Sequence, residues 1–206
     1  MINQFFDIVV CLTQKDRPDR GIMFDQECEK WGIKSELFYS IKNKDPKVSF
    51  CESQIGMLKW CLEQEGDTFL TLEDDVEFRL ESLQQSIHEL PKDWTMFYLG
   101  ANVKPYPEFT PAEYYSPNLR IIKSAFCTHA VAYRRELIEE IVRTYEYKEG
   151  QLYDTWLDIH ILKTRPVYIC CPMTAIQKPV NSTLWDRTVD YGDIWKGSDD
   201  YLLGVR

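Results

Sequence analysis

The chain has 206 residues, of which 44% are hydrophobic and 14% aromatic, and its formal net charge is −9. This composition excludes an intrinsically disordered chain and disfavours non-specific binding to a polyanion such as nucleic acid. No apolar run approaches the length of a membrane-spanning helix, and the N-terminus lacks a signal-peptide pattern, so we expect a soluble, cytoplasmic protein.

The first half of the chain alternates strands and helices. An apolar strand over residues 7–12 is followed by an amphipathic helix over 20–31 and a second strand over 35–41. Ser49 and Glu52 have the spacing of a capping box, which predicts that another helix begins there. This order predicts an α/β fold in which helices flank a mixed, mostly parallel central sheet.

The third strand ends in an acidic run. Residues 68–72 are mostly apolar and are followed by Glu73, Asp74 and Asp75. Because unpaired carboxylates cannot lie in a core, the strand should end at the sheet edge, where α/β proteins bind ligands. If the chain stays extended, Glu73 and Asp75 share one side and repel each other unless a cation lies between them. We predict a Mg²⁺ or Mn²⁺ site there; a solvated acidic loop is the alternative.

The second half contains further predicted elements. Helices are expected over residues 83–90, 135–145 and 154–163, and strands over 94–99, 119–123, 128–133, 167–171 and 174–177. The loop over 101–118 contains four prolines and several aromatic residues, including Phe109. A loop of this length either shapes a substrate cleft or packs as a lid over the core. The tail after residue 181 has little periodicity.

Two aspartates and seven cysteines complete the candidate residues. Asp154 is a suitable N-cap, and Asp158 lies four residues later, on the same face of a helix. The cysteines are odd in number and form no Cys-x-x-Cys pair, so we expect reduced core thiols rather than a zinc site. His129 and His160 are candidates for a third metal ligand, but a packed or surface histidine is the favoured interpretation of each.

Several segments, in order, resemble glycosyltransferase family 25, which includes bacterial lipopolysaccharide glycosyltransferases and collagen galactosyltransferases. The segments are Val9 to Leu12 with Asp19 and Arg20, Ser53, Leu72 to Val76, Tyr98 to Gly100, Thr128 to Tyr133, Asp154, and Ala175 to Gln177. Gln54 stands where the family usually has histidine. The resemblance spans nearly the whole chain and rests on the order and spacing of these motifs.

The resemblance implies one GT-A-type domain over residues 1–206, with a nucleotide-sugar half over about 1–100 and an acceptor half over about 101–206. It also implies that a sugar, often galactose, is transferred with inversion from a nucleotide sugar, with the help of a divalent metal.

Each candidate residue then receives a predicted role. Glu73 and Asp75 hold Mn²⁺ or Mg²⁺, which neutralises the departing diphosphate. Asp154 and Asp158 are the candidates for the catalytic base that deprotonates the acceptor. The nucleotide diphosphate sugar, with a UDP-sugar as the first choice, is predicted to contact Leu12, Thr13, Arg20, Ser53, Asp74 and Gln177.

The predicted function is therefore a metal-dependent inverting hexosyltransferase, in the cytoplasm of a bacterial or virus-infected cell. Its acceptor would be a hydroxyl group on a glycan, lipopolysaccharide or protein. Two alternatives stay open. One is a glycosyltransferase that acts on modified nucleobases of phage DNA, which requires a local basic patch. The other is a catalytically silent module that binds nucleotide sugars.

Overall fold

The computed structural model describes residues 2–103, 111–182 and 187–204. Its strands are β1 (Ile8–Thr13), β2 (Glu36–Tyr39), β3 (Thr68–Glu73), β4 (Val76–Phe78), β5 (Met96–Tyr98), β6 (Glu113–Ser116), β7 (Leu119–Ile122), β8 (Ala130–Arg134), β9 (Val167–Cys170), β10 (Ala175–Gln177), β11 (Val180–Ser182) and β12 (Arg187–Val189). Its helices are α1 (Pro18–Trp31), α2 (Pro46–Glu63), α3 (Leu83–Glu89), α4 (Arg135–Thr144), α5 (Tyr153–Leu157) and α6 (Gly192–Leu203). Shorter helical segments lie at Ile2–Gln4 and Leu80–Ser82, and a π-helical turn at Asp158–Leu162 follows α5.

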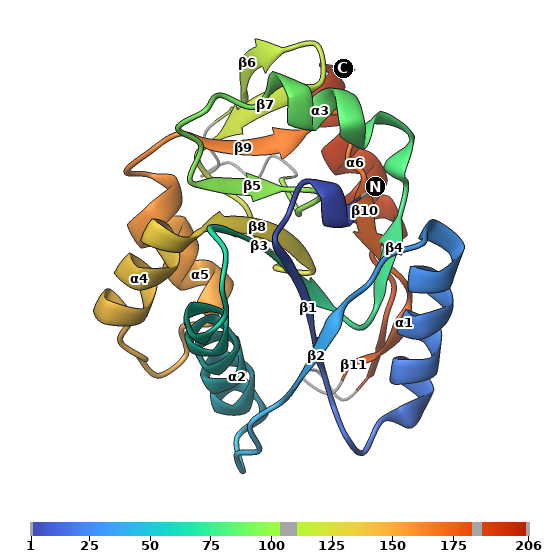
Figure 1. Cartoon of the computed structure of the whole chain (residues 1–206), viewed down its shortest axis with the longest axis vertical. Helices are drawn as coiled ribbons and strands as arrows, with labels where there is room; N and C mark the ends of the chain where they lie inside the picture. Colours follow the sequence, from blue (N-terminus) through green and yellow to red (C-terminus); the bar gives the residue numbers. More distant parts are fainter. Residues whose placement is uncertain (1, 104–110, 183–186, 205–206) are drawn as a thin grey trace.

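Eight strands form the central sheet in the order β2-β1-β3-β8-β5-β9-β7-β6 (Figure 1). The pairings show that β8 and β7 run opposite to the other strands, so six of the eight point the same way. Strands β4 and β10 form a separate antiparallel pair, and β11 pairs with β12. The predicted α/β architecture, with helices flanking a mostly co-directional sheet, is confirmed.

The opening strand–helix–strand unit brings three strand ends together. Strand β1 pairs in parallel with both β2 and β3, and its Leu12 lies opposite Phe38 and Glu73. The carboxyl ends of these strands therefore meet at one edge of the sheet. This is the edge at which open α/β sheets bind ligands.

Strand β8 brings a distant segment to the same edge because it runs antiparallel to β3. Leu72 lies opposite Ala130, and the backbone N–H of Glu73 donates to the carbonyl of His129 at 3.0 Å. The residues just before β8 consequently lie beside the acidic residues that end β3.

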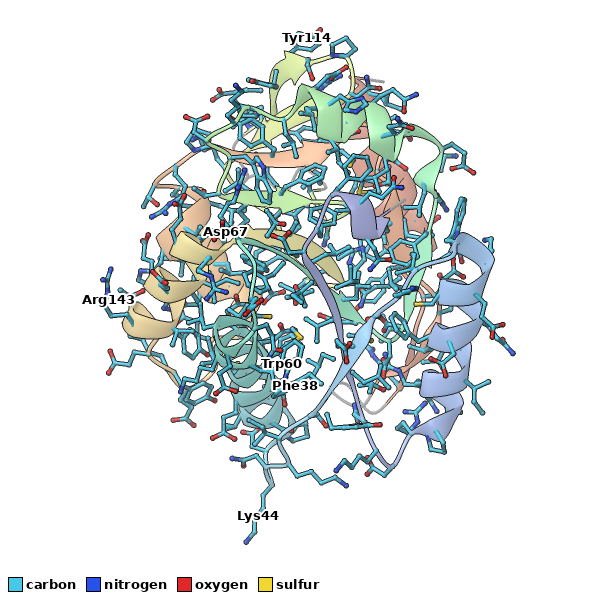
Figure 2. The ribbon with its side chains drawn as sticks, viewed as in Figure 1. Phe38, Lys44, Trp60, Asp67, Tyr114 and Arg143 are labelled. Carbon is cyan, nitrogen blue, oxygen red and sulfur yellow. The ribbon has the colours of Figure 1, made fainter. Side chains whose placement is uncertain are left out.

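The hydrophobic core lies on both faces of the sheet, because neighbouring residues of each central strand point in opposite directions. In β1, Val10 belongs to the cluster that includes buried residues of α2, α4, α5 and α6, whereas Val9 belongs to the cluster that includes those of α1 and α3. Phe38 and Trp60 extend the first of these clusters (Figure 2). Burial on both faces explains why the central strands read as continuous apolar runs.

Gly100 allows β10 to reach this sheet. A Cβ atom at this position would lie 1.8 Å from the carbonyl oxygen of Ala175, a distance that no side chain tolerates. The backbone N–H groups of Thr174 and Ala175 both donate to the carbonyl of Leu99. The glycine therefore permits a close approach that sets the position of the whole β10 segment.

Some local predictions were wrong. Helix α2 begins at Pro46, and Asp45, not Ser49, caps it by accepting a hydrogen bond from the Lys47 backbone N–H at 2.8 Å. The proline fixes a helical φ at the first position, and the short aspartate side chain reaches the free N–H groups. Asp154 is likewise not an N-cap, because α5 already begins at Tyr153.

The long loop and the tail contain unpredicted structure. Strand β6 lies inside the predicted 101–118 loop. Its residue Tyr114 is exposed, at the top of the molecule as drawn in Figure 2. Phe109 lies outside the described residues, so the two interpretations of that loop stay predictions. In the tail, α6 buries Trp195 and Leu202 against the core.

All seven cysteines are free thiols, as predicted, and six of them are buried. Over the described ranges, none of the helices combines the length and apolar character needed to cross a bilayer.

Candidate active site

A cavity of about 490 Å³ opens at the carboxyl ends of β1, β2 and β3. Most of the candidate site residues line it, namely Leu12, Thr13, Arg20, Ser53, Glu73, Asp74, Asp75, Asp154 and Gln177. The exceptions are Asp158 and the two histidine candidates, His129 and His160. Residues more than a hundred positions apart in the chain therefore meet around one cavity. They do so because the parallel strands end at the same edge of the sheet and the antiparallel β8 begins there.

The turn after β3 is held by a buried ion cluster. The Nη2 atom of Arg20, in the first turn of α1, lies 2.6 Å from Asp74 Oδ1 and 2.8 Å from Asp75 Oδ2. The Thr13 hydroxyl donates to the other oxygen of Asp74 at 2.8 Å. Each of the three charged side chains is at least nine-tenths buried. A buried charge needs such a partner, since an unpaired one is strongly destabilising.

The predicted alternation of the three acids does not hold. Strand β3 ends at Glu73, and Asp74 and Asp75 form a turn, so both aspartates contact the same guanidinium. Glu73 and Asp75 nevertheless approach a shared neighbour, the amide nitrogen of Gln177, at 3.4 Å and 3.3 Å. Glu73 and Asp75, the pair predicted to hold a metal, thus point toward the same location. A turn brings them together, rather than the predicted extended strand.

Glu73 is surrounded by hydrogen-bond donors that sequence reasoning did not identify. Its Oε1 atom accepts from the Thr128 hydroxyl at 2.8 Å and from Gln54 Nε2 at 3.3 Å. Burial and the neighbouring charge of Asp75 raise the pKa of Glu73 to about 8. Gln54 thus contacts the acidic site directly. The contact of Thr128 with Glu73 follows from the antiparallel pairing of β8 with β3, and no local sequence pattern indicates that pairing.

The residues around the cavity fit a divalent cation between Glu73 and Asp75. Among the described lining residues there are four carboxylates and one basic side chain, Arg20, which is already paired with two of them. Glu73 Oε2 and Asp75 Oδ1 have only the long contacts from Gln177, and the Gln177 Oε1 atom has no partner. Carboxylate and amide oxygens are ligands that Mg²⁺ and Mn²⁺ accept.

The histidine candidates do not complete this set. His129 is fully buried and its Nε2 lies 3.3 Å from the Ala175 carbonyl, while His160 stacks on Trp156. Neither lines the cavity. Across residues 2–103, 111–182 and 187–204, no three histidine, cysteine, aspartate or glutamate side chains converge on a metal-sized point. A cation here would therefore have two carboxylate ligands and other oxygen ligands.

Asp154 lies on another part of the cavity wall. One of its oxygens accepts from the Cys127 backbone N–H at 3.2 Å and the other from the Thr155 N–H at 2.7 Å. Cys127 also lines the cavity and has a left-handed backbone with φ of 71°, which is uncommon for a residue other than glycine. Burial raises the pKa of Asp154, and these hydrogen bonds oppose that rise. The carboxylate is therefore positioned by backbone groups and more basic than an exposed aspartate.

Asp158 and Ser53 are occupied by structural contacts. Asp158 accepts from the Ser124 hydroxyl at 2.5 Å, pairs with Lys163 at 3.2 Å and does not line the cavity. The Ser53 hydroxyl lines the cavity, donates to the Ser49 carbonyl at 2.6 Å and accepts from the Ile41 N–H at 2.9 Å. Ser53 thereby fixes α2 to the segment after β2.

Comparisons with known proteins bear on the fold. No protein-family model and no curated protein sequence matches the chain. Among solved structures, the inositol-1-phosphate CTP transferase from T. maritima is similar over 98% of both chains, with a TM-score of 0.50 and 10% identity. A UDP-glucose pyrophosphorylase complexed with UDP-glucose matches over 96% of this chain and 80% of its own (TM-score 0.49, 11% identity).

A glycosyltransferase involved in glycosylation of the major capsid of PBCV-1 matches over 75% of this chain and 76% of its own, with a TM-score of 0.44 and 9% identity. At such identities a similarity concerns the fold and leaves the activity to other evidence. The specific resemblance to family 25 stays a prediction that rests on the motifs. The chain has the mixed α/β, GT-A-like fold that the sequence predicted.

Proposed function

We propose that this protein is a metal-dependent inverting glycosyltransferase, which moves a hexose from a nucleotide diphosphate sugar to a hydroxyl group. One observation carries the proposal: the same cavity is lined by the acidic turn after β3 and by Asp154. Its volume of about 490 Å³ lies within the range of small-molecule sites. A donor sugar and an acceptor hydroxyl can therefore meet between the carboxylates of the acidic turn and the carboxylate of Asp154, which have different hydrogen-bond partners.

The donor half of the reaction uses the residues at the ends of β1 and β3. Glu73 and Asp75 would hold Mn²⁺ or Mg²⁺, which supplies the positive charge that neutralises the departing diphosphate. Arg20 fixes both aspartates, and Thr13 fixes Asp74 from the other side. Each carboxylate oxygen can accept a second hydrogen bond, so Asp74 can still bind a ribose hydroxyl of the donor.

The acceptor half of the reaction uses Asp154. As the acceptor oxygen bonds to the anomeric carbon, the bond from that carbon to the diphosphate breaks on the opposite side, and Asp154 takes the hydroxyl proton. Burial raises the pKa of Asp154, which makes it a better proton acceptor than an exposed aspartate. Asp158 does not line the cavity, so we assign the base to Asp154 alone.

The chemistry of the cavity favours a neutral acceptor. Arg20 is the one basic residue among the described residues that line it, and its guanidinium is already paired. A glycan hydroxyl meets no repulsion there, whereas the phosphates of DNA would. We propose a UDP-sugar as the donor, with galactose as the hexose that the family 25 motifs suggest.

Incubation with a panel of nucleotide sugars and Mn²⁺ tests the proposal, with release of the nucleotide diphosphate as the readout. We expect hydrolysis of at least one donor by the wild type and its loss in Asp75→Ala. Asp93→Ala is the matched control, because Asp93 is exposed and does not line the cavity. No hydrolysis of any donor, or equal hydrolysis by Asp75→Ala, would support a catalytically silent module instead.

A further inference from the structure

The side-chain amide of Gln177 has an unusual set of contacts. Gln177 is only 8% exposed, ends β10 and lines the cavity. Its Nε2 lies 3.4 Å from Glu73 Oε2 and 3.3 Å from Asp75 Oδ1, whereas its Oε1 is buried with no hydrogen-bond partner. Both contacts are longer than the roughly 2.7–2.9 Å of a strong charge-assisted hydrogen bond. A buried carbonyl oxygen without a donor is destabilising.

The main chain around this amide is fixed on both sides. The Gln177 carbonyl accepts from the indole N–H of Trp195 at 3.2 Å, and the N–H of Lys178 donates to the Asp75 carbonyl at 2.7 Å. Gln177 also lies opposite Val76 in the β10–β4 pair. The backbone therefore holds the side chain beside Asp75, and rotation about its last torsion angle is the freedom that remains.

That rotation exchanges the amide nitrogen and oxygen. With the nitrogen toward Glu73 and Asp75, the amide acts as a neutral donor between the two carboxyl groups. With the oxygen toward them, three oxygen atoms converge, an arrangement that a cation between them stabilises. The orientation of the amide is thus coupled to occupancy by a cation.

We propose that Gln177 is a third protein ligand of the divalent cation, with Oε1 turned toward Glu73 and Asp75 when the cation is bound. In the metal-free protein the amide nitrogen takes the place of the cation between the two carboxylates. This inference rests on the cation site of the proposed function. It assigns Gln177 to the metal rather than to the donor sugar, and it gives the buried, unpartnered oxygen of Gln177 a role.

Binding of Mn²⁺ alone, followed by electron paramagnetic resonance without any nucleotide, tests the inference. We expect Gln177→Leu to weaken Mn²⁺ binding by about tenfold or more, since a ligand oxygen is lost. Gln151→Leu is the matched control: Gln151 Oε1 is also buried without a partner, but Gln151 does not line the cavity. Its Mn²⁺ affinity should equal that of the wild type.

The Gln177→Glu variant provides a second readout that does not depend on the leucine variant folding. It places a third carboxylate beside Glu73 and Asp75, so its melting temperature without metal should fall below that of the wild type. Mn²⁺ should raise the melting temperature of this variant more than that of the wild type. A melting temperature of Gln177→Glu that responds to Mn²⁺ no more than the wild type would contradict the inference.

The outcomes separate this inference from the proposed function. If the wild type binds Mn²⁺ and Gln177→Leu binds it equally well, the inference is wrong and the proposed function stands. If the wild type binds no Mn²⁺ in the absence of donor, the inference is also overturned. Donor hydrolysis then decides the proposed function by itself.

Discussion

The Nη2 atom of Arg20 lies 2.6 Å from the carboxylate of Asp74, although one residue lies in the first turn of α1 and the other follows β3. Both side chains are at least nine-tenths buried, and the same nitrogen also contacts Asp75. The contact joins the first turn of α1 to the turn after β3, which together form the donor side of the cavity. It is therefore a structural requirement of the site as well as part of it.

Replacement of Arg20 by Met should destabilise the protein by about 3–5 kcal/mol, because two buried carboxylates lose their partner. Arg17→Met is the matched control in the same segment. Arg17 forms a more exposed ion pair with Asp19, and such pairs contribute about 1 kcal/mol or less. Urea denaturation measures both. An equal, small effect of the two substitutions would show that the cluster with Asp74 and Asp75 is not a buried ion cluster in solution.

The two candidate bases should differ in their effect on turnover. Asp154→Asn should reduce kcat by roughly 10²–10⁴-fold, since proton acceptance by a positioned side chain contributes that much. Donor binding should be retained. Asp158→Asn should keep turnover, because Asp158 contacts Ser124 and Lys163 rather than the cavity. Steady-state kinetics with the best donor of the panel would refute the assignment if Asp154→Asn kept full activity.

Gly100 and Gly21 offer a contrast between two glycine-to-alanine substitutions. At Gly100 the new Cβ would clash with the Ala175 carbonyl, so β10 must move and we expect a loss of about 4 kcal/mol or more. At Gly21, inside α1, the Cβ meets nothing within 4 Å, and the helix should gain about 0.5–1 kcal/mol. Thermal denaturation of both variants measures the difference. A stable Gly100→Ala protein would mean that β10 does not lie against the end of β5.

His129 should make stability depend on pH. Burial lowers its pKa from 6.5 to about 4, and the hydrogen bond to Ala175 and the charge of Asp75 oppose this. The unfolded chain protonates this histidine below pH 6.5, whereas the folded protein does so only near pH 4. The stability contributed by the neutral ring is therefore fully present above pH 6.5 and is lost as the pH falls toward 4.

Relative to His129→Gln, the wild type should lose about 2 kcal/mol of unfolding free energy between about pH 7 and about pH 5. The difference between the two proteins isolates the histidine, because the carboxylates titrate in both. Chemical denaturation at the two pH values gives the comparison. Parallel loss of stability in the wild type and the variant would show that His129 is not a buried neutral group.

The first half of the fold was predictable because its elements carry local signals. The apolar run that forms β1 and the acids that end β3 specify a strand and a strand end without reference to other parts of the chain. The start of α2 was predicted wrongly because two capping signals compete there, and Asp45 followed by Pro46 prevails over Ser49. Local signals of similar strength cannot be ranked without the contacts of the folded chain.

The site was predictable as a set of residues but not as a set of contacts. Thr128 and Gln177 reach Glu73 only through the antiparallel β8 and the close approach of β10 at Gly100. Asp158, by contrast, was predicted to belong to the site and does not. Its spacing from Asp154 correctly indicated that the two carboxylates lie near each other, and both contact the segment before β8. Only Asp154 reaches the cavity, however. Helix α6 escaped prediction because glycine, serine and aspartate separate its two buried anchors, Trp195 and Leu202.

The most direct measurement is a crystal structure of the protein with UDP and Mn²⁺. The account predicts that the diphosphate lies in the cavity at the ends of β1 and β3, with Mn²⁺ between Glu73 and Asp75. The contrasting location is the smaller cavity of about 310 Å³, which is lined by Arg134 and Arg135 together with Asp67, Glu136 and Glu139. Nucleotide bound at that second cavity, with none beside Glu73 and Asp75, would contradict the account.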